Sequence, residues 1–496
     1  MRPVFTAQQM RETENRLFDI GASSLELMEK AAGELAKAIF EVLPEDGKTC
    51  VFACGGGGNG GDGYAAARIF ASHGGRAVIL KLCEPKTEDA KINFERALKK
   101  VYACVDINAL GTLPRPDVWA DCIFGIGFHG EIEGDAAKVI ARMNADRCLG
   151  SKIVACDIPS GLNADTGETG ALCVKADVTV TFQALKRGHL LGNGLGVCGE
   201  TLVRDIGIPA GLYPETFLKQ IDDEDVKNAL PQRNRTGHKN SFGHLLIVAG
   251  SLGMAGAAVI CAKAALRTGC GLVTVACPKS LTDIIQISVP CAMCLPLEET
   301  EGAISINALE TLKNALNGKN AIAIGPGLSG KVPPEIIEAV LDSGINTALD
   351  ADALNIIARH RELINKLHIN CAITPHPGEA ARLLDEKVNP DAVKTAMRLS
   401  EYGACALVKG ASSVIAGKHL SVTSSGTDGM AKGGSGDALT GMVGALLAQG
   451  MEAEAALWAA SQLHGRAGEK ASELYGRASM LPTDLIDCIG LVYPND

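Results

Sequence analysis

A glycine-rich turn in the second half of the chain ends in a carboxylate. The segment GMAKGGSGDALTG places Gly433, Gly434 and Gly436 directly before Asp437, and an apolar helix is expected to follow. Amide groups at a helix N-terminus bind anions, and glycine lets a phosphate approach the backbone closely. A carboxylate there can orient a hydroxyl group and accept its proton as it attacks phosphorus. The alternative is a simple helix cap, but capping does not require so many glycines. The pattern favours a phosphoryl-transfer site with Asp437 as its base.

Two shorter segments of the second half each allow two interpretations. In TPHPGEAARLL, Glu379 either helps to hold a hydrated Mg2+ with His376 touching substrate, or only complements the dipole of a helix that begins there. In VKGASS, Lys409 to Ser413 either contact a nucleotide or form a hairpin turn, and taken alone the segment favours the hairpin.

The first half carries a different glycine loop. In GGGGNGGDGYAAAR the spacing Gly55-x-Gly57-x-x-Gly60 is that of a dinucleotide-binding turn. Asn59 and Asp62 lie inside it, however, and a carboxylate is unexpected in a loop that cradles phosphates. A second candidate, Asp157, ends the apolar segment KIVACD, where a catalytic carboxylate belongs in a parallel sheet. In isolation, turn statistics favour a purely structural role for this aspartate.

Composition limits the class of protein. The chain has 496 residues, 57 glycines and a net charge of −10, which argues against a nucleic-acid partner. Its 17 cysteines lie in apolar stretches and are interpreted as reduced thiols that fill the core. Because no signal peptide or apolar run of membrane-spanning length is present, we expect a cytoplasmic protein with no membrane partner.

The elements that must position these residues alternate between strand-like and helix-like segments. Apolar runs such as TCVFAC, AVILKLC and KIVACD are separated by helical stretches, and the alternation begins again at HLLIVAGS. This predicts an α/β protein of two doubly wound domains, the first a Rossmann-like three-layer domain. A segment rich in proline, acid and turn residues separates the two, so we place the domains at residues 1–215 and 216–496.

The ordered motifs GPGLSG, LDADALN, TPHPGE, VKGASS and GMAKGGSGD resemble those of the ADP- or ATP-dependent NAD(P)H-hydrate dehydratases, which are ribokinase-like domains. The resemblance implies that substrate contacts Ala257, Gly327, His376 and Asp437, and that Mg2+ and ADP or ATP are required. It implies a nucleotide site made of Lys409, Gly410, Ala411, Ser412, Ser413, Thr427, Asp428, Gly429, Met430, Ala431, Lys432, Gly433, Gly434, Ser435 and Gly436. The acid Asp428 departs from the family pattern and is expected to weaken nucleotide binding.

The first half resembles the NAD(P)H-hydrate epimerases through GGGGNGGDGYAAAR, DCIFGIGFHGEIEG, ACDIPSGLNADTG and TVTFQALKRG. The resemblance implies catalysis by Asp157 and a K+ ion held by Asn59, Asp121 and Ser160, whose side-chain oxygens suit a hard cation. It also implies a site for hydrated dinucleotide made of Gly58, Asn59, Gly60, Gly61, Asp62, Gly125, Ile126, Gly127, Phe128, His129, Gly130, Glu131 and Asp157. The family usually has two asparagines in the glycine loop; here Gly58 replaces the first.

Together the two resemblances predict an enzyme that repairs hydrated NADH and NADPH. The first domain interconverts the R and S hydrates, and the second phosphorylates the S hydrate and eliminates phosphate. The fusion of both domains favours ADP over ATP, and a homo-oligomer is expected. The alternatives are an NAD-dependent oxidoreductase or a non-catalytic dinucleotide sensor fused to a small-molecule kinase. Glu84, at the end of AVILKLCE, gives the oxidoreductase some support as a ribose-binding acid.

Overall fold

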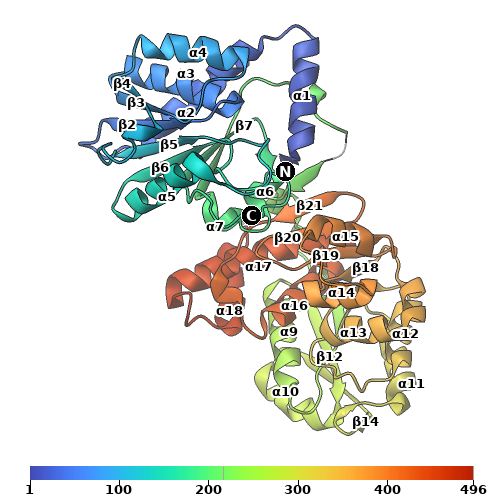
Figure 1. Ribbon diagram of the computed structural model, residues 1–496. Coiled ribbons are helices and arrows are strands. Elements are labelled where there is room, and N and C mark those ends of the chain that lie inside the picture. The colour runs from blue at the N-terminus through green and yellow to red at the C-terminus, as the bar shows by residue number, and fades with distance from the viewer. Residues whose placement is uncertain (216, 495–496) are drawn as a thin grey trace. The chain divides into compact units, whose positions relative to one another are not determined.

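The computed structural model describes residues 1–215 and 217–494 and contains two compact units (Figure 1). The first is Arg2–Leu218, and the second is Lys219–Asp496 together with Met1. The residue at which we expected the second domain to begin, 216, lies outside the described residues. Each unit has its own mainly parallel sheet and its own buried core, so the predicted fold class, α/β with two doubly wound domains, is confirmed.

The N-terminal unit is built on a seven-stranded parallel sheet with the order β4-β3-β2-β5-β6-β7-β9. The chain proceeds outward from β2 in one direction and resumes at β5 on the other side. Ligands of open α/β sheets bind at such a reversal, beyond the carboxyl ends of the strands. The strands are β2 (Thr49–Cys54), β3 (Arg76–Lys81), β4 (Ala103–Asp106), β5 (Val118–Cys122), β6 (Lys152–Cys156), β7 (Val178–Phe182) and β9 (Glu200–Arg204), with a separate parallel pair β1 (Arg2–Phe5) and β8 (Leu185–Lys186).

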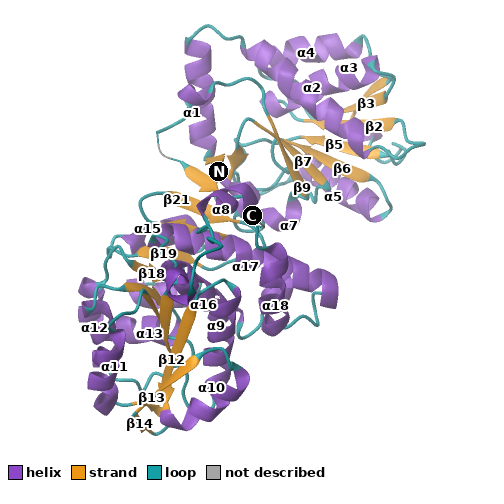
Figure 2. Ribbon diagram, turned by 180° about the vertical axis from the view of Figure 1, so that it is seen from behind, coloured by secondary structure: helices purple, strands orange, loops and turns teal. Residues whose placement is uncertain are grey.

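Helices cover both faces of this sheet. One core cluster joins α2 and α3 to inward side chains of the sheet such as Phe52 and Ile79, and another joins α5 to the opposite face through Trp119 and Ile153. Helix α1 is set apart from the other long helices of this unit (Figure 2). The helices are α1 (Ala7–Asp19), α2 (Ser24–Val42), α3 (Gly58–Ser72), α4 (Glu88–Leu98), α5 (Gly134–Cys148), α6 (Arg187–Leu190) and α7 (Gly194–Val197).

The C-terminal unit has a longer sheet, whose strands follow the order β13-β12-β11-β16-β17-β18-β19-β20-β21-β10. Neighbours are parallel from β13 to β19, while β20 runs antiparallel to β19 and β21. The strand order reverses between β11 and β16, as it does between β2 and β5 in the first unit. The strands are β10 (Leu218–Gln220), β11 (His244–Val248), β12 (Leu272–Pro278), β13 (Met293–Leu297), β16 (Ala321–Ile324), β17 (Asn346–Leu349), β18 (Cys371–Ile373), β19 (Cys405–Val408), β20 (Ser413–Ala416) and β21 (Leu420–Thr423), beside the small hairpin β14 (Glu299–Thr300) and β15 (Ala303–Ile304).

Two helical layers enclose this sheet. Small strand residues such as Ala321, Ala323 and Ala348 let α9, α16 and α17 pack closely on one face. A succession of neighbouring helices from α11 to α15 forms the other layer. The helices are α8 (Asp223–Ala229), α9 (Ala255–Arg267), α10 (Thr282–Ser288), α11 (Leu309–Leu316), α12 (Pro334–Asp342), α13 (Ala351–Arg359), α14 (Pro377–Leu384), α15 (Ala392–Ser400), α16 (Ser435–Ala448), α17 (Ala453–Tyr475) and α18 (Pro482–Val492).

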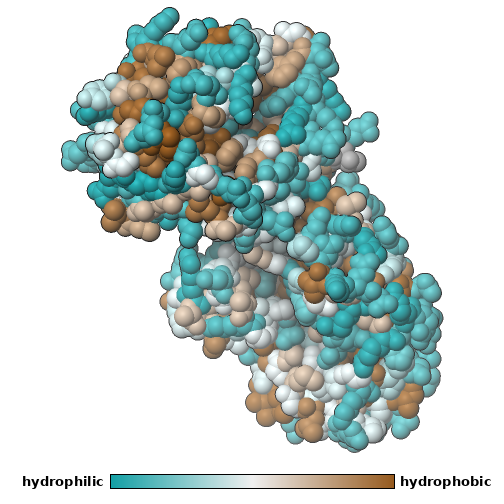
Figure 3. Space-filling model, viewed as in Figure 1, coloured by the Kyte–Doolittle hydropathy of each residue, from teal (hydrophilic) through white to brown (hydrophobic). Residues whose placement is uncertain are grey.

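The surface seen in Figure 3 is mostly hydrophilic on both units, with smaller apolar patches between charged side chains. In the described part of the chain no helix is both long and apolar enough to cross a membrane. The 17 cysteines are all free thiols, and most are buried, in agreement with their expected role as core residues.

Candidate active sites

A cavity of about 910 Å³ opens at the strand-order reversal of the N-terminal unit. Its floor is formed by the loops that follow β2 and β5, and α1 contributes one wall through Arg11 and Glu14. The two loops approach each other so closely that a Cβ at Gly55 would overlap the carbonyl oxygen of Ile123. Glycine is therefore required here to bring the two loops together.

Asp157 lines this cavity directly after β6, in a left-handed backbone conformation with φ of 64°. Its Oδ1 atom accepts hydrogen bonds from the Thr181 hydroxyl at 2.8 Å and from Lys186 Nζ at 2.5 Å. The Lys186 ammonium also donates to Thr181 Oγ1 and to the carbonyl oxygen of Phe182, at 2.9 and 3.2 Å. All three ammonium protons are thereby engaged, so Lys186 is held in place as a fixed positive charge.

This arrangement keeps Asp157 ionised. Burial alone disfavours the carboxylate, but the charge and hydrogen bond of Lys186 lower the pKa of Asp157 below its ordinary value. His189 fixes the backbone: its Nδ1 accepts the Lys186 N–H, so Nε2 donates to the Asp157 carbonyl oxygen at 2.9 Å. Burial lowers the pKa of His189 to about 4, which leaves the imidazole neutral.

Two further carboxyl groups line the same cavity. Burial raises the pKa of Glu14 to about 6. Burial, together with the negative charges of Asp157 and Glu14, raises the pKa of Asp62 well above its ordinary value. The cavity therefore combines one carboxylate that is held ionised with two acids that are easily protonated.

The three residues expected to bind an ion include a tightly connected pair. Asp121, fully buried at the end of β5, accepts the Ser160 N–H at 2.7 Å and the Ser160 hydroxyl at 2.6 Å. Burial raises the pKa of Asp121 to about 6. Asn59 lies against Gly125, one residue beyond Phe124, whose N–H donates to Ser160 Oγ. The Asn59 Nδ2 atom is enclosed without a hydrogen-bond partner.

The remaining residues expected to bind the dinucleotide divide into two groups. Gly58, Asn59, Asp62, Gly125, Ile126, Gly127, Phe128 and His129 line the cavity together with Asp157. Gly60, Gly61, Gly130 and Glu131 do not belong to its lining. A Cβ at Gly60 would overlap the Gly55 carbonyl, so this glycine shapes the turn, and Glu131 accepts the Ala171 N–H at 3.2 Å.

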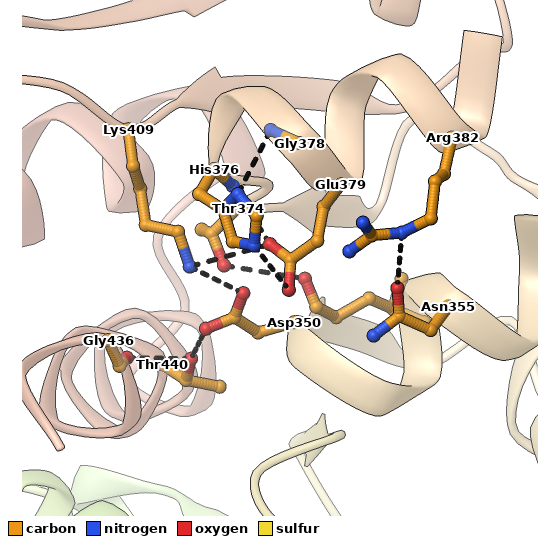
Figure 4. Close-up of polar contacts among 11 residues, drawn as sticks. Asp350, Asn355, Thr374, His376, Gly378, Glu379, Arg382, Lys409, Gly436 and Thr440 are labelled. Atoms are coloured by element: carbon orange, nitrogen blue, oxygen red, sulfur yellow. Dashed lines mark hydrogen bonds and ion pairs between the residues drawn. The ribbon is translucent and has the colours of Figure 1, made fainter. Parts of the chain in front are cut away.

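An ion pair between the buried Asp350 and the half-buried Lys409 lies at the carboxyl ends of β17 and β19 in the C-terminal unit (Figure 4). Asp350 Oδ1 accepts from Lys409 Nζ at 2.7 Å, and its Oδ2 accepts the Thr440 hydroxyl of α16 at 2.7 Å. Gly436 packs over this pair, since a Cβ there would lie 3.5 Å from Lys409 Nζ. The glycine turn of α16 thus lies beside the ion pair.

His376 and Glu379 occupy the first turn of α14, as Figure 4 shows. Glu379 Oε2 accepts the His376 N–H at 2.8 Å, which is the interaction of a capping box. The same carboxylate oxygen lies 3.9 Å from Lys409 Nζ. Glu379 therefore caps its helix and also faces the Asp350–Lys409 pair, so the two interpretations of this residue are compatible.

Asp437 lies in the first turn of α16, which begins after Gly434 in a left-handed conformation with φ of 105°. Burial, and then the negative charge of Asp350, raise the pKa of Asp437 to about 6. At neutral pH this group is largely ionised and basic enough to accept a proton from a hydroxyl group.

The other expected contacts lie at the same edge of the sheet. Lys409–Ser413 connects β19 to β20 as a hairpin. Ala257 of α9 and Gly327 adjoin each other, since a Cβ at Gly327 would lie 3.0 Å from that of Ala257. Thr427 donates to Asp428 Oδ1 at 3.0 Å, and this exposed carboxylate lies 3.8 Å from Arg477 Nε. Lys432 Nζ donates to the carbonyl oxygens of Ala478 and Met480.

Two family models match the chain. One, described as NAD(P)H-hydrate dehydratase, matches residues 245–490, and the other, described as YjeF-related protein N-terminus, matches residues 24–188. A bifunctional NAD(P)H-hydrate repair enzyme from Moorella thermoacetica is 35% identical, over 95% of this chain and 93% of that protein. The chain belongs to the bifunctional NAD(P)H-hydrate repair enzymes.

Another repair enzyme, from Escherichia coli, is 34% identical over 98% of this chain and 93% of its own length. A solved structure, an ADP/ATP-dependent NAD(P)H-hydrate dehydratase from Bacillus subtilis co-crystallised with ATP and Mg2+, is 26% identical with a TM-score of 0.48 and covers 56% of this chain and 98% of that chain. As a repair enzyme this chain combines an epimerase with a dehydratase, which confirms the predicted family, enzyme class and function.

Sequence reasoning missed several residues that lie in the two candidate sites, including Glu14 in the cavity of the N-terminal unit. Thr181 and Lys186 lie in TVTFQALKRG, a segment that carried the resemblance but to which no role was assigned. Asp350 lies in LDADALN, and Thr440 follows Asp437 on α16. The only local signal was at Asp350, which directly follows an apolar strand as Asp157 does.

Proposed function

We propose that the N-terminal unit epimerises hydrated NAD(P)H in the cavity beside Asp157, and that the C-terminal unit dehydrates the S hydrate at the Asp350–Lys409–Asp437 centre. One observation carries the first assignment. Asp157 lines the cavity, and its Oδ1 atom accepts hydrogen bonds from Thr181 and Lys186. No described residue donates a hydrogen bond to its Oδ2 atom. A carboxylate with one fixed and one available oxygen is suited to take a proton from a bound molecule.

Epimerisation requires the hydroxyl group to leave one face of the nicotinamide ring and water to return to the other. The lone pair of the ring nitrogen expels the hydroxyl, which leaves as water after receiving a proton, and an iminium ion remains. A water molecule then attacks the opposite face and gives its proton to a base. The ionised Asp157 can act only as this base near neutral pH, because Lys186 lowers its pKa.

The glycine turns on either side of the cavity are suited to bind the dinucleotide. Gly58, Asn59 and Asp62 contribute from the β2 loop, and Gly125 to His129 contribute from the β5 loop. Backbone amides of such turns can donate to the pyrophosphate, and the cavity volume lies within the range of pockets for small molecules.

The Asn59, Asp121 and Ser160 side chains fit a monovalent cation such as K+. A fully buried carboxylate with no cationic partner among the described residues is costly, and a bound cation would offset that cost. The amide of Asn59 has an enclosed atom without a partner, and rotation of the amide by half a turn would put its oxygen there. A bound K+ would supply positive charge near the dinucleotide.

Dehydration requires conversion of the hydroxyl group into a better leaving group. We assign Asp437 as the base that removes its proton as the oxygen attacks the terminal phosphorus of the nucleotide. The nucleotide leaves as AMP or ADP, and the ring nitrogen then expels the transferred group as inorganic phosphate, which leaves an iminium ion. Loss of a proton from the adjacent ring carbon restores NAD(P)H. Lys409, fixed by Asp350, and the first amides of α16 provide positive charge for the phosphates.

Mg2+ is bound in proteins through one or two carboxylates and the phosphates of the nucleotide. No cluster of three or more metal-ligating side chains was found among the described residues. Asp350 and Glu379 fit this limited role, because both carboxylates approach Lys409 Nζ. The ion would neutralise phosphate charge.

We infer that ADP is preferred over ATP, and that the protein is a cytoplasmic homo-oligomer.

The test uses a mixture of R and S hydrates of NADPH with Mg2+, K+ and either ADP or ATP. Full return of the reduced-nicotinamide absorbance with one nucleotide is expected. No return with either nucleotide would contradict the dehydratase assignment. Return that stops when the S hydrate is consumed would contradict the epimerase assignment. Light scattering on the same preparation measures the oligomeric state.

A further inference from the structure

The proposed nucleotide loop is seated on helix α17. Gly465 and Gly468 lie one turn apart on this helix. A Cβ at Gly465 would overlap the hydroxyl oxygen of Ser425 and lie 2.5 Å from its carbonyl carbon, and a Cβ at Gly468 would overlap the Met430 sulfur. The two glycines therefore form a shallow seat that admits Ser425 and the Met430 side chain, at the two ends of the segment 425–430.

A carboxylate next to this seat holds the loop at a single backbone amide. Glu469 Oε1 accepts the Gly426 N–H at 2.8 Å. Gly426 has φ of 126°, a conformation that other residues rarely adopt, so the chain changes direction at the anchored amide. Thr427, the first residue of the proposed nucleotide site in this loop, follows directly.

The other oxygen of Glu469 is held by a second helix through an arginine. Arg466 Nη1 donates to Glu469 Oε2 at 2.8 Å, and Arg466 Nε donates to Asp223 Oδ1 of α8 at 2.9 Å. Gln462 Nε2 donates to the same Asp223 oxygen at 2.7 Å, and the Gln462 carbonyl accepts the Ser425 hydroxyl at 3.0 Å. The anchor is thus braced from α8 and tied back to the loop.

We propose that Glu469 is a positioning residue for nucleotide binding in the dehydratase reaction. It acts through Gly426, which it holds so that the turn formed by residues 427–436 is placed beside the nucleotide. The inference rests on the proposed nucleotide site. A hydrogen bond to a charged acceptor is stronger than one between neutral groups, and without it the loop must be ordered when the nucleotide binds. The free-energy cost of ordering the loop therefore lowers the affinity for nucleotide.

The experiment compares Glu469→Ala and Glu469→Gln with Glu473→Ala. Glu473 is the matched control because it lies one turn further on α17 and pairs with Lys470 at 2.8 Å, away from the loop. We measure KM for ADP and ATP, KM for the S hydrate, kcat, nucleotide Kd and hydrogen exchange of a peptide covering residues 424–434. Glutamine keeps an acceptor for Gly426 but cannot pair with Arg466 as an anion.

Glu469→Ala is expected to raise KM and Kd for nucleotide about tenfold, with KM for the S hydrate and kcat within about twofold. Glu469→Gln should lie between it and the wild type, and Glu473→Ala should match the wild type. The loop peptide should exchange faster only in the Glu469 variants. Equal nucleotide KM in Glu469→Ala and Glu473→Ala would overturn the inference, as would an equal loss in both substrates' KM and kcat.

Failure of the proposed function gives a different result. If the wild-type chain binds neither ADP nor ATP, the nucleotide site itself is wrong. If the wild type binds nucleotide and Glu469→Ala binds it equally well, only the role of Glu469 is wrong. Epimerisation of the R hydrate by the N-terminal unit serves as an internal control for the amount of folded chain in each preparation.

Discussion

Lys186 Nζ lies 2.5 Å from Asp157 Oδ1, and this contact determines the charge of the proposed epimerase base. Lys186 is 1% exposed and Asp157 is 13% exposed. Burial disfavours the charged form of Asp157, but the charge and hydrogen bond of Lys186 and the hydrogen bond of Thr181 lower its pKa, so the carboxylate stays ionised. The proton that the departing hydroxyl requires must therefore come from a group other than Asp157.

Replacing Lys186 by methionine removes that charge at nearly constant volume. Burial then dominates and raises the pKa of Asp157, so the carboxylate becomes protonated at a higher pH. The rate of R-to-S conversion should fall at least tenfold at neutral pH. In the pH–rate profile, the acidic limb should move to higher pH. Thr181→Val, which removes a hydrogen bond but no charge, should move it less. An unchanged acidic limb in Lys186→Met contradicts this role of Lys186.

Asp157→Asn tests the base directly and keeps a side chain that tolerates the left-handed backbone. Epimerisation should fall by about 100-fold or more, because general base catalysis contributes that much. Dehydration of pure S hydrate in the other unit should be unchanged. In a mixture of epimers, recovery of NADPH should slow sharply after the S hydrate is used. Complete recovery at the wild-type rate would exclude Asp157 as the base.

Asp437→Asn should reduce dehydration of the S hydrate by about 100-fold or more while epimerisation continues. Burial raises the pKa of Asp437 to about 6, and the base acts only when ionised. For the wild type, kcat/KM should therefore decline as the pH falls through about 6 and approach a constant value above it. Measured with pure S hydrate at fixed nucleotide, a profile that is flat down to pH 5 would contradict the assignment.

Removal of K+ should slow epimerisation and leave the C-terminal unit unaffected if Asn59, Asp121 and Ser160 bind the ion. Asp121→Asn removes the buried negative charge and should make the epimerase insensitive to K+ at a lower basal rate. The measurement is the R-to-S rate over a K+ titration in a background of a large organic cation. Equal K+ dependence in the wild type and the variant would show that Asp121 does not bind the ion.

The contact between α9 and α16 leaves no room for a side chain at Gly441, because a Cβ there would overlap the carbonyl oxygen of Cys261. Gly441→Ala should lower the free energy of unfolding of the C-terminal unit by about 1–3 kcal/mol through overpacking. Gly490→Ala is the control: its Cβ would meet nothing within 4 Å in α18. That variant should gain about 0.5–1 kcal/mol from helix propensity. Thermal unfolding of both variants distinguishes the two effects.

The residues that could be predicted from the sequence are those whose position follows from one strand and its turn. Asp157 directly follows an apolar strand, where ligands of parallel sheets bind, and Asp437 lies where an apolar helix begins after a glycine turn, so each was predicted as a candidate site residue from its local pattern. The doubly wound architecture follows from the same alternation of segments. Both assignments depend only on local sequence.

The partners of these residues could not be predicted in this way. Lys186 follows Asp157 by 29 positions and belongs to a two-residue strand, β8, whose course no periodicity indicates. Lys409 and Asp350 are separated by 59 positions and meet only because β17 and β19 flank β18 in the sheet. Helix α1 has an evident capping box, but nothing local shows that Glu14 faces the cavity. Tertiary packing decides these contacts.

At Asp157 the left-handed backbone conformation lowers stability, whereas the carboxylate is the group proposed to serve activity. A non-glycine residue at φ of 64° is strained by about 1–2 kcal/mol, and glycine at this position would be free of that strain. A screen of variants for heat resistance alone would therefore tend to select glycine in place of Asp157. If Asp157 is the epimerase base, a heat-resistant variant that carries glycine at this position should have lost the epimerase reaction and kept the dehydratase reaction.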